Sequence, residues 1–289
     1  MTETATEFRL RSRLMRTVYD HSLLREGDRV MVCISGGKDS LTMLHLLERA
    51  QRELPFSFEL IAVHLDQRQP GYDGSALRSW LGARKTPFEI LSEDTYSEVV
   101  ARTPEGATFC AACSRLRRGI LYTAAARLGA NKIALGHHRE DTLETFLLNL
   151  VYSGRMQAMP ARYRTDDGRF EVIRPLIECA EKDIAELARA NAFPILPCNL
   201  CGSQKDLKRD QMGALLAQLE KMNPHVRQSM LGALSNVRAT HLLDVELDAA
   251  WSARPAEIPA RSEAKETAVR FAALPVHGSH VVETLLQPP

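Results

Sequence analysis

Six residues near the amino terminus, Ser-Gly-Gly-Lys-Asp-Ser at positions 35–40, combine the groups that proteins use to bind phosphate. Glycines let backbone N–H groups approach an anion, and a helix that begins directly after them adds the positive end of its dipole. Lys38 supplies a mobile positive charge, and the hydroxyls of Ser35 and Ser40 can donate hydrogen bonds. The spacing differs from the Walker motif, which has four residues between its first glycine and the Gly-Lys pair. We therefore expect a phosphate-binding turn of another kind rather than a turn whose glycines serve geometry alone.

Two Cys-x-x-Cys pairs, Cys110 with Cys113 and Cys198 with Cys201, are the second group of residues that could do chemistry. In a chain of 289 residues they indicate metal or redox chemistry rather than a disulfide framework. Four thiolates could hold zinc, although zinc ribbons space their pairs at about fifteen to twenty residues. Iron–sulfur clusters accept ligands that lie far apart in the chain. A redox pair is the third alternative, because an arginine-rich helix start would lower a thiol pKa.

Arginines follow the first cysteine pair and recur later in the chain. Arg115, Arg117 and Arg118 occupy the expected helix start, and five more lie between residues 155 and 174. We expect both groups to contact RNA phosphates, so that binding weakens as salt rises. The alternative is a solvated helix face that binds nothing.

The elements that must position these groups are strands and helices in alternation. Apolar runs predict buried strands at residues 30–34, 60–66, 88–91 and 132–136, and helical patterns lie between them. This order predicts an α/β fold with a parallel sheet and helices on both faces.

Ligands of such sheets gather at the carboxyl ends of the strands, where three polar groups fall together. They are the turn at 35–40, Asp66, and the segment 137–141. Asp66 is either a nucleotide contact or an ordinary loop carboxylate. Asp141 is either the cap of a new helix or a contact for Mg²⁺ or an adenylate. The two histidines before it point opposite ways if the segment is extended, so we do not expect them to share a metal ion.

Changes in composition predict four regions. Residues 1–28 form a helical amino-terminal region, and 29–155 form the ATP-binding domain. Residues 156–244 form a smaller, mostly helical region with the second cysteine pair, and 245–289 form a peripheral tail, partly disordered, with little periodicity.

The overall composition says more about where the protein is located than about what it binds. The net charge is only +1, so any nucleic-acid site must be local. No apolar run is long enough to span a bilayer, and the first residues lack a basic region followed by an apolar one. We expect a cytoplasmic protein without a membrane segment.

Five motifs together resemble one known family. Residues 35–40 resemble the PP-loop of the ATP pyrophosphatase superfamily, whose members cleave ATP between the α and β phosphates. Four further segments are similar, in the same order, to the tRNA 2-thiocytidine biosynthesis (TtcA) family. They are Leu-Asp-Gln-Arg-Gln-Pro-Gly at 65–71, Cys-Ala-Ala-Cys-Ser-Arg-Leu-Arg-Arg-Gly at 110–119, Ala-Leu-Gly-His-His-Arg-Glu-Asp at 134–141 and Pro-Cys-Asn-Leu-Cys-Gly-Ser-Gln at 197–204. The resemblance covers residues 8–244 and says nothing about the tail.

The resemblance implies an ATP-dependent tRNA sulfurtransferase. Such an enzyme makes 2-thiocytidine at cytidine 32 of the anticodon loop, by adenylating the base O2 and replacing it with sulfur. The implied cofactors are Mg²⁺ and a 4Fe-4S cluster that leaves one iron open for sulfide, with ATP as co-substrate. The implied partners are the tRNA, a cysteine desulfurase as sulfur source, and a second copy in a homodimer.

Carried over by motif, the resemblance also assigns site residues. The implied catalytic residues are Lys38, Asp39 and Asp141. The implied cluster ligands are Cys110, Cys113 and Cys201. The implied nucleotide-binding residues are Ser35, Gly36, Gly37, Lys38, Asp39, Ser40, Asp66 and Gly136. One departure is Glu140, where the family pattern has aspartate; Asp141 is retained.

Two other functions stay open at this point. The chain could be another PP-loop tRNA-modifying enzyme, one that thiolates uridine or makes lysidine. A lysidine-type enzyme would need no cysteine cluster, so metal analysis separates it from a thiolase. The chain could also be an iron–sulfur redox sensor without catalysis, which tRNA-dependent conversion of ATP to AMP would exclude.

Overall fold

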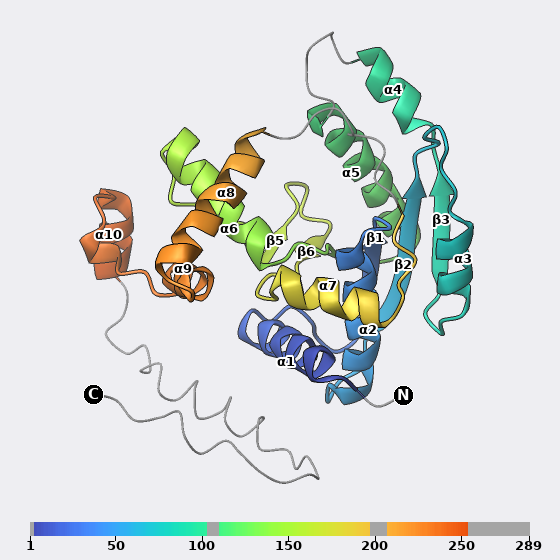
Figure 1. The fold of residues 1–289 in the computed structure, drawn as a ribbon, viewed down its shortest axis with the longest axis horizontal. Helices are drawn as coiled ribbons and strands as arrows, with labels where there is room; N and C mark the ends of the chain where they lie inside the picture. Colours follow the sequence, from blue (N-terminus) through green and yellow to red (C-terminus); the bar gives the residue numbers. More distant parts are fainter. Residues whose placement is uncertain (1–2, 103–109, 197–206, 254–289) are drawn as a thin grey trace. The chain divides into compact units, whose positions relative to one another are not determined.

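The computed structural model describes residues 3–102, 110–196 and 207–253. Within them, six strands form one sheet in the order β3-β2-β1-β4-β6-β5 (Figure 1). Every neighbouring pair is parallel except the last, β6 with β5, which is antiparallel. The strands are β1 (Arg29–Ile34), β2 (Glu59–Asp66), β3 (Phe88–Ser92), β4 (Lys132–Ala134), β5 (Arg162–Arg164) and β6 (Glu171–Ile173).

The chain divides into two compact units, residues 1–235 and 236–289. The first unit contains the sheet and the helices α1 (Ala5–Asp20), α2 (Lys38–Glu53), α3 (Ser75–Gly82), α4 (Thr95–Arg102), α5 (Cys110–Arg127), α6 (Arg139–Leu148), the π-helix η1 (Asn149–Ser153), α7 (Glu181–Ala190), α8 (Leu207–Met222) and α9 (Val226–Leu234). In the second unit the structure describes a short 3-10 helix, η2 (Ala239–His241), and α10 (Val245–Ser252).

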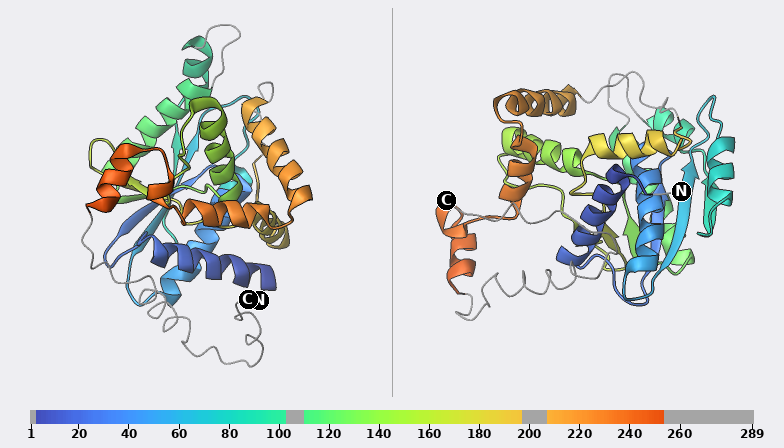
Figure 2. Two further views of the ribbon diagram at one scale, coloured as in Figure 1. Left: turned by 90° about the vertical axis from the view of Figure 1, so that its left-hand side faces the viewer. Right: turned by 60° about the horizontal axis from the view of Figure 1, so that its bottom comes forward.

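Helices cover both faces of the sheet, because the side chains of a strand point alternately to its two sides. On β1, Val30 and Val32 enter a core with α1, α2 and α7. Met31, between them, enters a second core with α5. Figure 2 shows these helices on either side of the strands. The expected α/β fold, with a mostly parallel sheet and helices on both faces, is confirmed.

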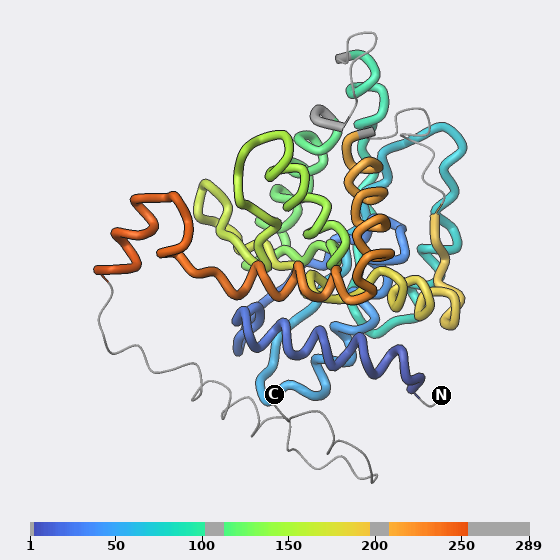
Figure 3. The backbone as a smooth tube through the Cα atoms, turned by 60° about the vertical axis from the view of Figure 1, so that its left-hand side comes forward, coloured from blue at the N-terminus to red at the C-terminus, as the bar shows by residue number. Residues whose placement is uncertain are grey.

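The sheet does not end at residue 155, where the sequence predicted that the ATP-binding domain ends. β6 pairs with β4, so residues beyond 155 supply the last two strands. Each of these strands has only three residues, too few for a periodic pattern to predict. After them the chain is helical, and α8 and α9 pack against α6 through a small apolar cluster (Figure 3).

The remaining regional expectations are only partly covered by the described residues. α10 begins at Val245, where the peripheral tail was expected, while residues 254–289 lie outside the described part. No helix in the described ranges is both long and apolar enough to cross a membrane.

Candidate active site

The turn after β1 is closed by its own serine hydroxyls. The Ser35 N–H donates to Ser40 Oγ at 3.1 Å, and Ser40 Oγ donates to the Gly37 carbonyl at 2.9 Å. Gly37 is the N-cap of α2 and offers no side chain to the first N–H groups of that helix. These N–H groups are the donors that an anion at a helix start accepts from. The turn therefore has the form expected of a phosphate site.

Two glycines are required by close packing around this turn. Gly36 has φ +83°, and a Cβ there would lie 2.6 Å from Leu196 Cδ1. The Leu196 N–H also donates to the Gly36 carbonyl at 2.9 Å. A Cβ on Gly136 would lie 3.1 Å from the backbone nitrogen of Ser40. Gly136 thus brings the end of β4 directly against the phosphate turn.

Lys38 stands at the start of α2 between two carboxylates. Its Nζ lies 2.9 Å from Glu181 Oε1 and 3.2 Å from Asp39 Oδ1. Burial alone would lower the pKa of Lys38, but the hydrogen bond to Glu181 and the charge of Asp39 raise it above the ordinary lysine value. Lys38 is therefore a fixed cation, with 27% of its side-chain surface exposed beside the turn.

A cavity of about 590 Å³ opens at the carboxyl ends of the strands. Its floor is the sheet face below α5, and its walls come from the phosphate turn, the start of α5, and α6. Of the predicted site residues, Ser35, Asp39, Ser40, Gly136 and Asp141 line it. Its volume lies within the range of small-molecule sites.

Asp39 and Asp141 approach each other around His138. His138 Nε2 lies 3.8 Å from Asp39 Oδ1 and 3.5 Å from Asp141 Oδ2. Asp39 Oδ1 is buried without a hydrogen-bond partner in the described structure. Asp141 caps α6 by accepting from the His138 N–H at 2.9 Å, as the simpler of its two readings predicted. Asp39 Oδ1 accepts no hydrogen bond from a described residue, although the Lys38 ammonium lies 3.2 Å away. Its position beside a second carboxylate fits the oxygen ligands that Mg²⁺ prefers.

The side chains of His137 and His138 lie in different surroundings, as expected for neighbours on an extended segment. Burial would lower the pKa of His138, but its hydrogen bond to Glu140 and the charges of Asp141 and Asp39 raise it. Burial and the positive charge of Arg174 lower the pKa of His137 to about 4. His138 is thus favoured as a cation and His137 as a neutral imidazole.

The first cysteine pair lies at the start of α5, beside the loop that follows β2. Cys110 is the first residue of that helix. Cys113 is half-buried, and its Sγ donates to Gln67 Oε1 at 3.4 Å. Gln67 is only 7% exposed and also accepts from Thr95 Oγ1. A partly exposed thiol one turn before the arginines of the cavity wall fits a cluster ligand.

The second cysteine pair cannot be placed, since Cys198 and Cys201 lie outside the described residues. The last described residue before them, Leu196, rests on Gly36 of the phosphate turn. The described chain therefore contacts the phosphate turn directly before that segment.

Asp66 ends β2, as predicted, but does not line the cavity. Its Oδ1 accepts the N–H of Arg68, at 2.8 Å, and so shapes the following loop. The loop-carboxylate reading describes this geometry, and the nucleotide contact stays a prediction.

Several residues at the site could not be derived from the sequence. Glu181 reaches Lys38 from α7, and Arg209 on α8 donates to Asp141 Oδ1 at 3.0 Å. Arg174, expected among the RNA-contacting arginines, is only 7% exposed; it directly follows β6 and contacts His137. No local spacing signals these pairs. The strand-end position of residue 174 would have been the one available indication.

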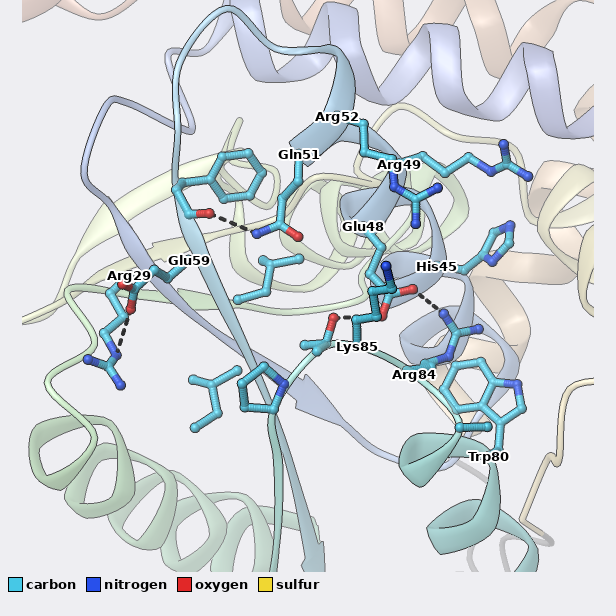
Figure 4. A pocket seen from close by; sticks show the side chains of 16 residues that line it. Arg29, His45, Glu48, Arg49, Gln51, Arg52, Glu59, Trp80, Arg84 and Lys85 are labelled. Carbon is cyan, nitrogen blue, oxygen red and sulfur yellow. Dashed lines mark hydrogen bonds and ion pairs between the residues drawn. The ribbon is translucent and has the colours of Figure 1, made fainter.

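A second hollow, of about 740 Å³, lies at the amino ends of the strands (Figure 4). Residues of α2, α3 and the starts of β1 and β2 line it, among them Trp80 and Arg84. The Arg84 guanidinium lies 3.6 Å from the centre of the Trp80 ring and forms an ion pair with Glu48. None of the predicted site residues lines this groove, so we assign the chemistry to the cavity at the carboxyl ends.

Comparison with known proteins identifies the family. A family model described as the PP-loop domain matches residues 7–195. A tRNA-cytidine(32) 2-sulfurtransferase from Cupriavidus metallidurans is 49% identical over 86% of this chain and 80% of its own length. The enzyme of that name from Coxiella burnetii is 47% identical over 88% of this chain and 98% of its own length.

A solved structure shares the fold. The U34-tRNA thiolase NcsA from Methanococcus maripaludis, solved with its 4Fe-4S cluster, has a TM-score of 0.62 with 21% identity. It covers 81% of this chain and 80% of its own. At this identity the likeness shows a shared fold, whereas the sequence relatives show the family. This chain belongs to the tRNA-cytidine(32) 2-sulfurtransferase family of PP-loop proteins.

Proposed function

We propose that the protein uses ATP to replace the O2 atom of cytidine 32 in tRNA with sulfur. One observation carries the proposal: the phosphate turn, the two carboxylates and the helix that bears Cys113 border a single cavity. The membership of the family, at close to half identity with named sulfurtransferases, supplies the substrate class.

The chain's own residues account for the first chemical step. The α2 N–H groups and Lys38 hold the phosphates of ATP and stabilise the charge that develops as pyrophosphate leaves. The cytosine O2 attacks the α-phosphorus, so that one O–P bond forms while the bond to the pyrophosphate oxygen breaks. In the second step sulfide attacks C2, and AMP leaves with the former O2. This second step is possible because adenylation has already made the base oxygen part of AMP, which is a good leaving group.

Mg²⁺ and an iron–sulfur cluster would complete the site. Asp39 and Asp141 would hold Mg²⁺, whose charge neutralises phosphate oxygens during the transfer. Cys110, Cys113 and Cys201 would hold a 4Fe-4S cluster, which supplies the sulfur for the second step. The assignment of these three cysteines, and of Lys38 as catalytic, is part of the proposal.

The RNA must present an unstacked base. Bases in single-stranded loops are available for recognition, and enzymes that modify a base take it into a pocket. Arg117 and Arg118 line the cavity, and neither forms an ion pair with a carboxylate of the described residues. They are placed to bind phosphates around the target base.

Nucleoside analysis tests the function directly. The holoenzyme, reconstituted without oxygen, is given a tRNA transcript with cytidine at position 32, ATP, Mg²⁺ and sulfide, and the digested product is examined by mass spectrometry. We expect 2-thiocytidine together with one AMP and one pyrophosphate. A thiolated uridine instead would favour the alternative suggested by U34 thiolases, and absence of tRNA-dependent AMP would favour a sensor.

The cysteine assignment has a separate readout in iron content. Cys113→Ala and Cys201→Ala should lose iron after anaerobic reconstitution, while Cys198→Ala should keep it. Cys179→Ala is a matched control, because Cys179 is buried in the core beneath α1. Iron loss in Cys198→Ala but not in Cys201→Ala would transfer the role between the two.

The remaining parts of the proposal concern assembly and location. We propose that the protein works in the cytoplasm, as a homodimer that receives sulfur from a cysteine desulfurase. Light scattering of the purified holoenzyme tests the dimer, and sulfur transfer from a desulfurase with labelled cysteine tests the donor.

A further inference from the structure

Arg174 is a buried cation without a carboxylate partner in the described structure. Its Nη1 donates to the Pro160 carbonyl at 2.7 Å, and its guanidinium lies 5.2 Å from the centre of the Tyr163 ring. Its Nε donates to His137 Nδ1 at 3.2 Å. Both Arg174 and His137 line the cavity. The guanidinium is thus held in place by three neighbours, one of which is the imidazole.

This contact decides which nitrogen of His137 carries the proton. Because a guanidinium can only donate, Nδ1 of His137 must accept, and the ring hydrogen of the neutral imidazole is on Nε2. Nε2 of His137 has no hydrogen-bond partner among the described residues, and it is not one of the fully buried polar atoms. His137, which lines the cavity, therefore carries an N–H donor that no described residue accepts from and that a bound ligand can use.

The donor lies close to where the adenylated oxygen must be. His137 directly follows Gly136, which packs against the backbone of Asp39 and Ser40 in the phosphate turn. A base whose O2 attacks the α-phosphorus held by that turn presents its neighbouring ring nitrogen, N3, a short distance away. Tyr122 and Tyr163 also line this part of the cavity, and a flipped base commonly stacks on such rings.

We propose that His137, oriented by Arg174, donates a hydrogen bond from Nε2 to N3 of the target base and so selects cytidine over uridine. This inference rests on the proposed function and names the residue that sets its base specificity. Cytosine N3 is a bare acceptor, whereas uracil N3 carries a hydrogen and would oppose the donor. A site built to pair with one polar group rejects an analogue that leaves it unpaired. His137 contacts the substrate, and Arg174 is a positioning residue.

A cycle of paired changes in protein and RNA isolates the contact. The holoenzyme and His137→Ala are each given tRNA with cytidine or 3-deazacytidine at position 32, where 3-deazacytidine carries a C–H in place of N3. Single-turnover formation of AMP is measured at saturating ATP. If His137 donates to N3, the deaza base should slow the wild type about tenfold more than it slows the variant. Equal slowing in both proteins would overturn the contact.

Comparing the two proteins cancels the effect that the altered base has on its own reactivity. Replacing N3 changes the reactivity of O2 in both proteins alike, so only the difference between them reports the hydrogen bond. His225→Ala, an exposed histidine at the start of α9, is the matched control and should show the wild-type ratio.

Arg174 is tested by its effect on discrimination rather than on rate alone. Arg174→Met removes the group that holds Nδ1 as an acceptor, so His137 can present a bare Nε2 instead of a donor. The preference for cytidine over uridine at position 32 should fall about tenfold, and Arg174→Lys should restore part of it. A merely structural role would lower both rates and leave their ratio unchanged, which would contradict the positioning role. Tyr163→Phe, which keeps the ring beneath the guanidinium, provides a milder variant if Arg174→Met does not fold.

Failure of this inference is distinguishable from failure of the proposed function. If the wild type does not thiolate cytidine 32, the function itself is wrong. If it does, but His137→Ala weakens ATP binding without tRNA, the donor belongs to the nucleotide and the specificity role is overturned. Unchanged ATP affinity with a lost cytidine preference would support the role.

Discussion

The two hollows at opposite ends of the strands are both lined by arginines, and the arginines differ in what they pair with. In the amino-end groove the partly buried guanidiniums are neutralised: Arg84 by Glu48, Arg49 by Glu7. In the carboxyl-end cavity Arg209 pairs with Asp141 and Glu144, but Arg117, Arg118 and Arg174 have no carboxylate partner among the described residues. Removing one partner of a buried ion pair destabilises the fold, while cations without a carboxylate partner attract an anionic ligand. The difference predicts that equal substitutions at the two ends have unequal consequences.

Loss of Lys38 should be the most damaging change to activity. Lys38→Met removes the cation at the phosphate turn, and the rate of AMP formation should fall by about 10²–10³, or roughly 3–4 kcal/mol. Lys85→Met is the matched change at the groove, since Lys85 is exposed there and has no ion pair in the described structure. It should leave the rate unchanged. Comparable losses in both would erase the distinction between the two hollows.

The groove should instead matter for stability. Arg84→Met leaves Glu48, which also accepts from Thr86 Oγ1, without its cation in a mostly buried setting. The free energy of unfolding should fall by about 3 kcal/mol, measured with urea, while the rate per folded molecule stays the same. A loss of activity beyond the loss of folded protein would mean that the groove takes part in function.

Charge reversal should separate the two ends in tRNA binding. Arg117→Glu with Arg118→Glu should weaken tRNA affinity about tenfold or more and lower the salt dependence by about two phosphate contacts. Arg52→Glu with Lys85→Glu, two exposed cations of the groove that form no ion pair within the described residues, gives the control with the same change in net charge. A parallel loss in the control would show that overall charge, rather than the cavity, governs binding.

The smallest expected difference concerns the glycines at either end of β1. Gly27 and Gly36 both have positive φ, but a Cβ on Gly27 meets nothing within 4 Å, whereas one on Gly36 collides with Leu196. Gly27→Ala should cost about 1 kcal/mol of stability from backbone strain, and Gly36→Ala about 1 kcal/mol more. Calorimetry checks this. ATP affinity should fall only for Gly36→Ala; equal behaviour would mean that Leu196 simply moves aside.

The sequence predicted β1 to β4 and the phosphate turn because their signals are local. The apolar run 30–34 and the hexapeptide after it are complete within a dozen residues. The partners of the turn are not local. Lys38 with Glu181, and His137 with Arg174, join residues from distant elements, which only the packing of the chain brings together. A local sequence pattern cannot predict that Arg174 is buried, because its burial depends on elements that are distant in the sequence.

The hydrogen bond from Leu196 to Gly36 connects the turn proposed to bind phosphate with the chain that leads to the proposed cluster ligand Cys201. Leu196 directly precedes the segment that holds Cys198 and Cys201, and Gly36 belongs to that turn. Binding at one end of this link that shifts Leu196 changes the free energy of binding at the other. Such coupling is reciprocal: the factor by which a bound nucleotide changes the affinity for the cluster equals the factor by which the cluster changes the affinity for the nucleotide.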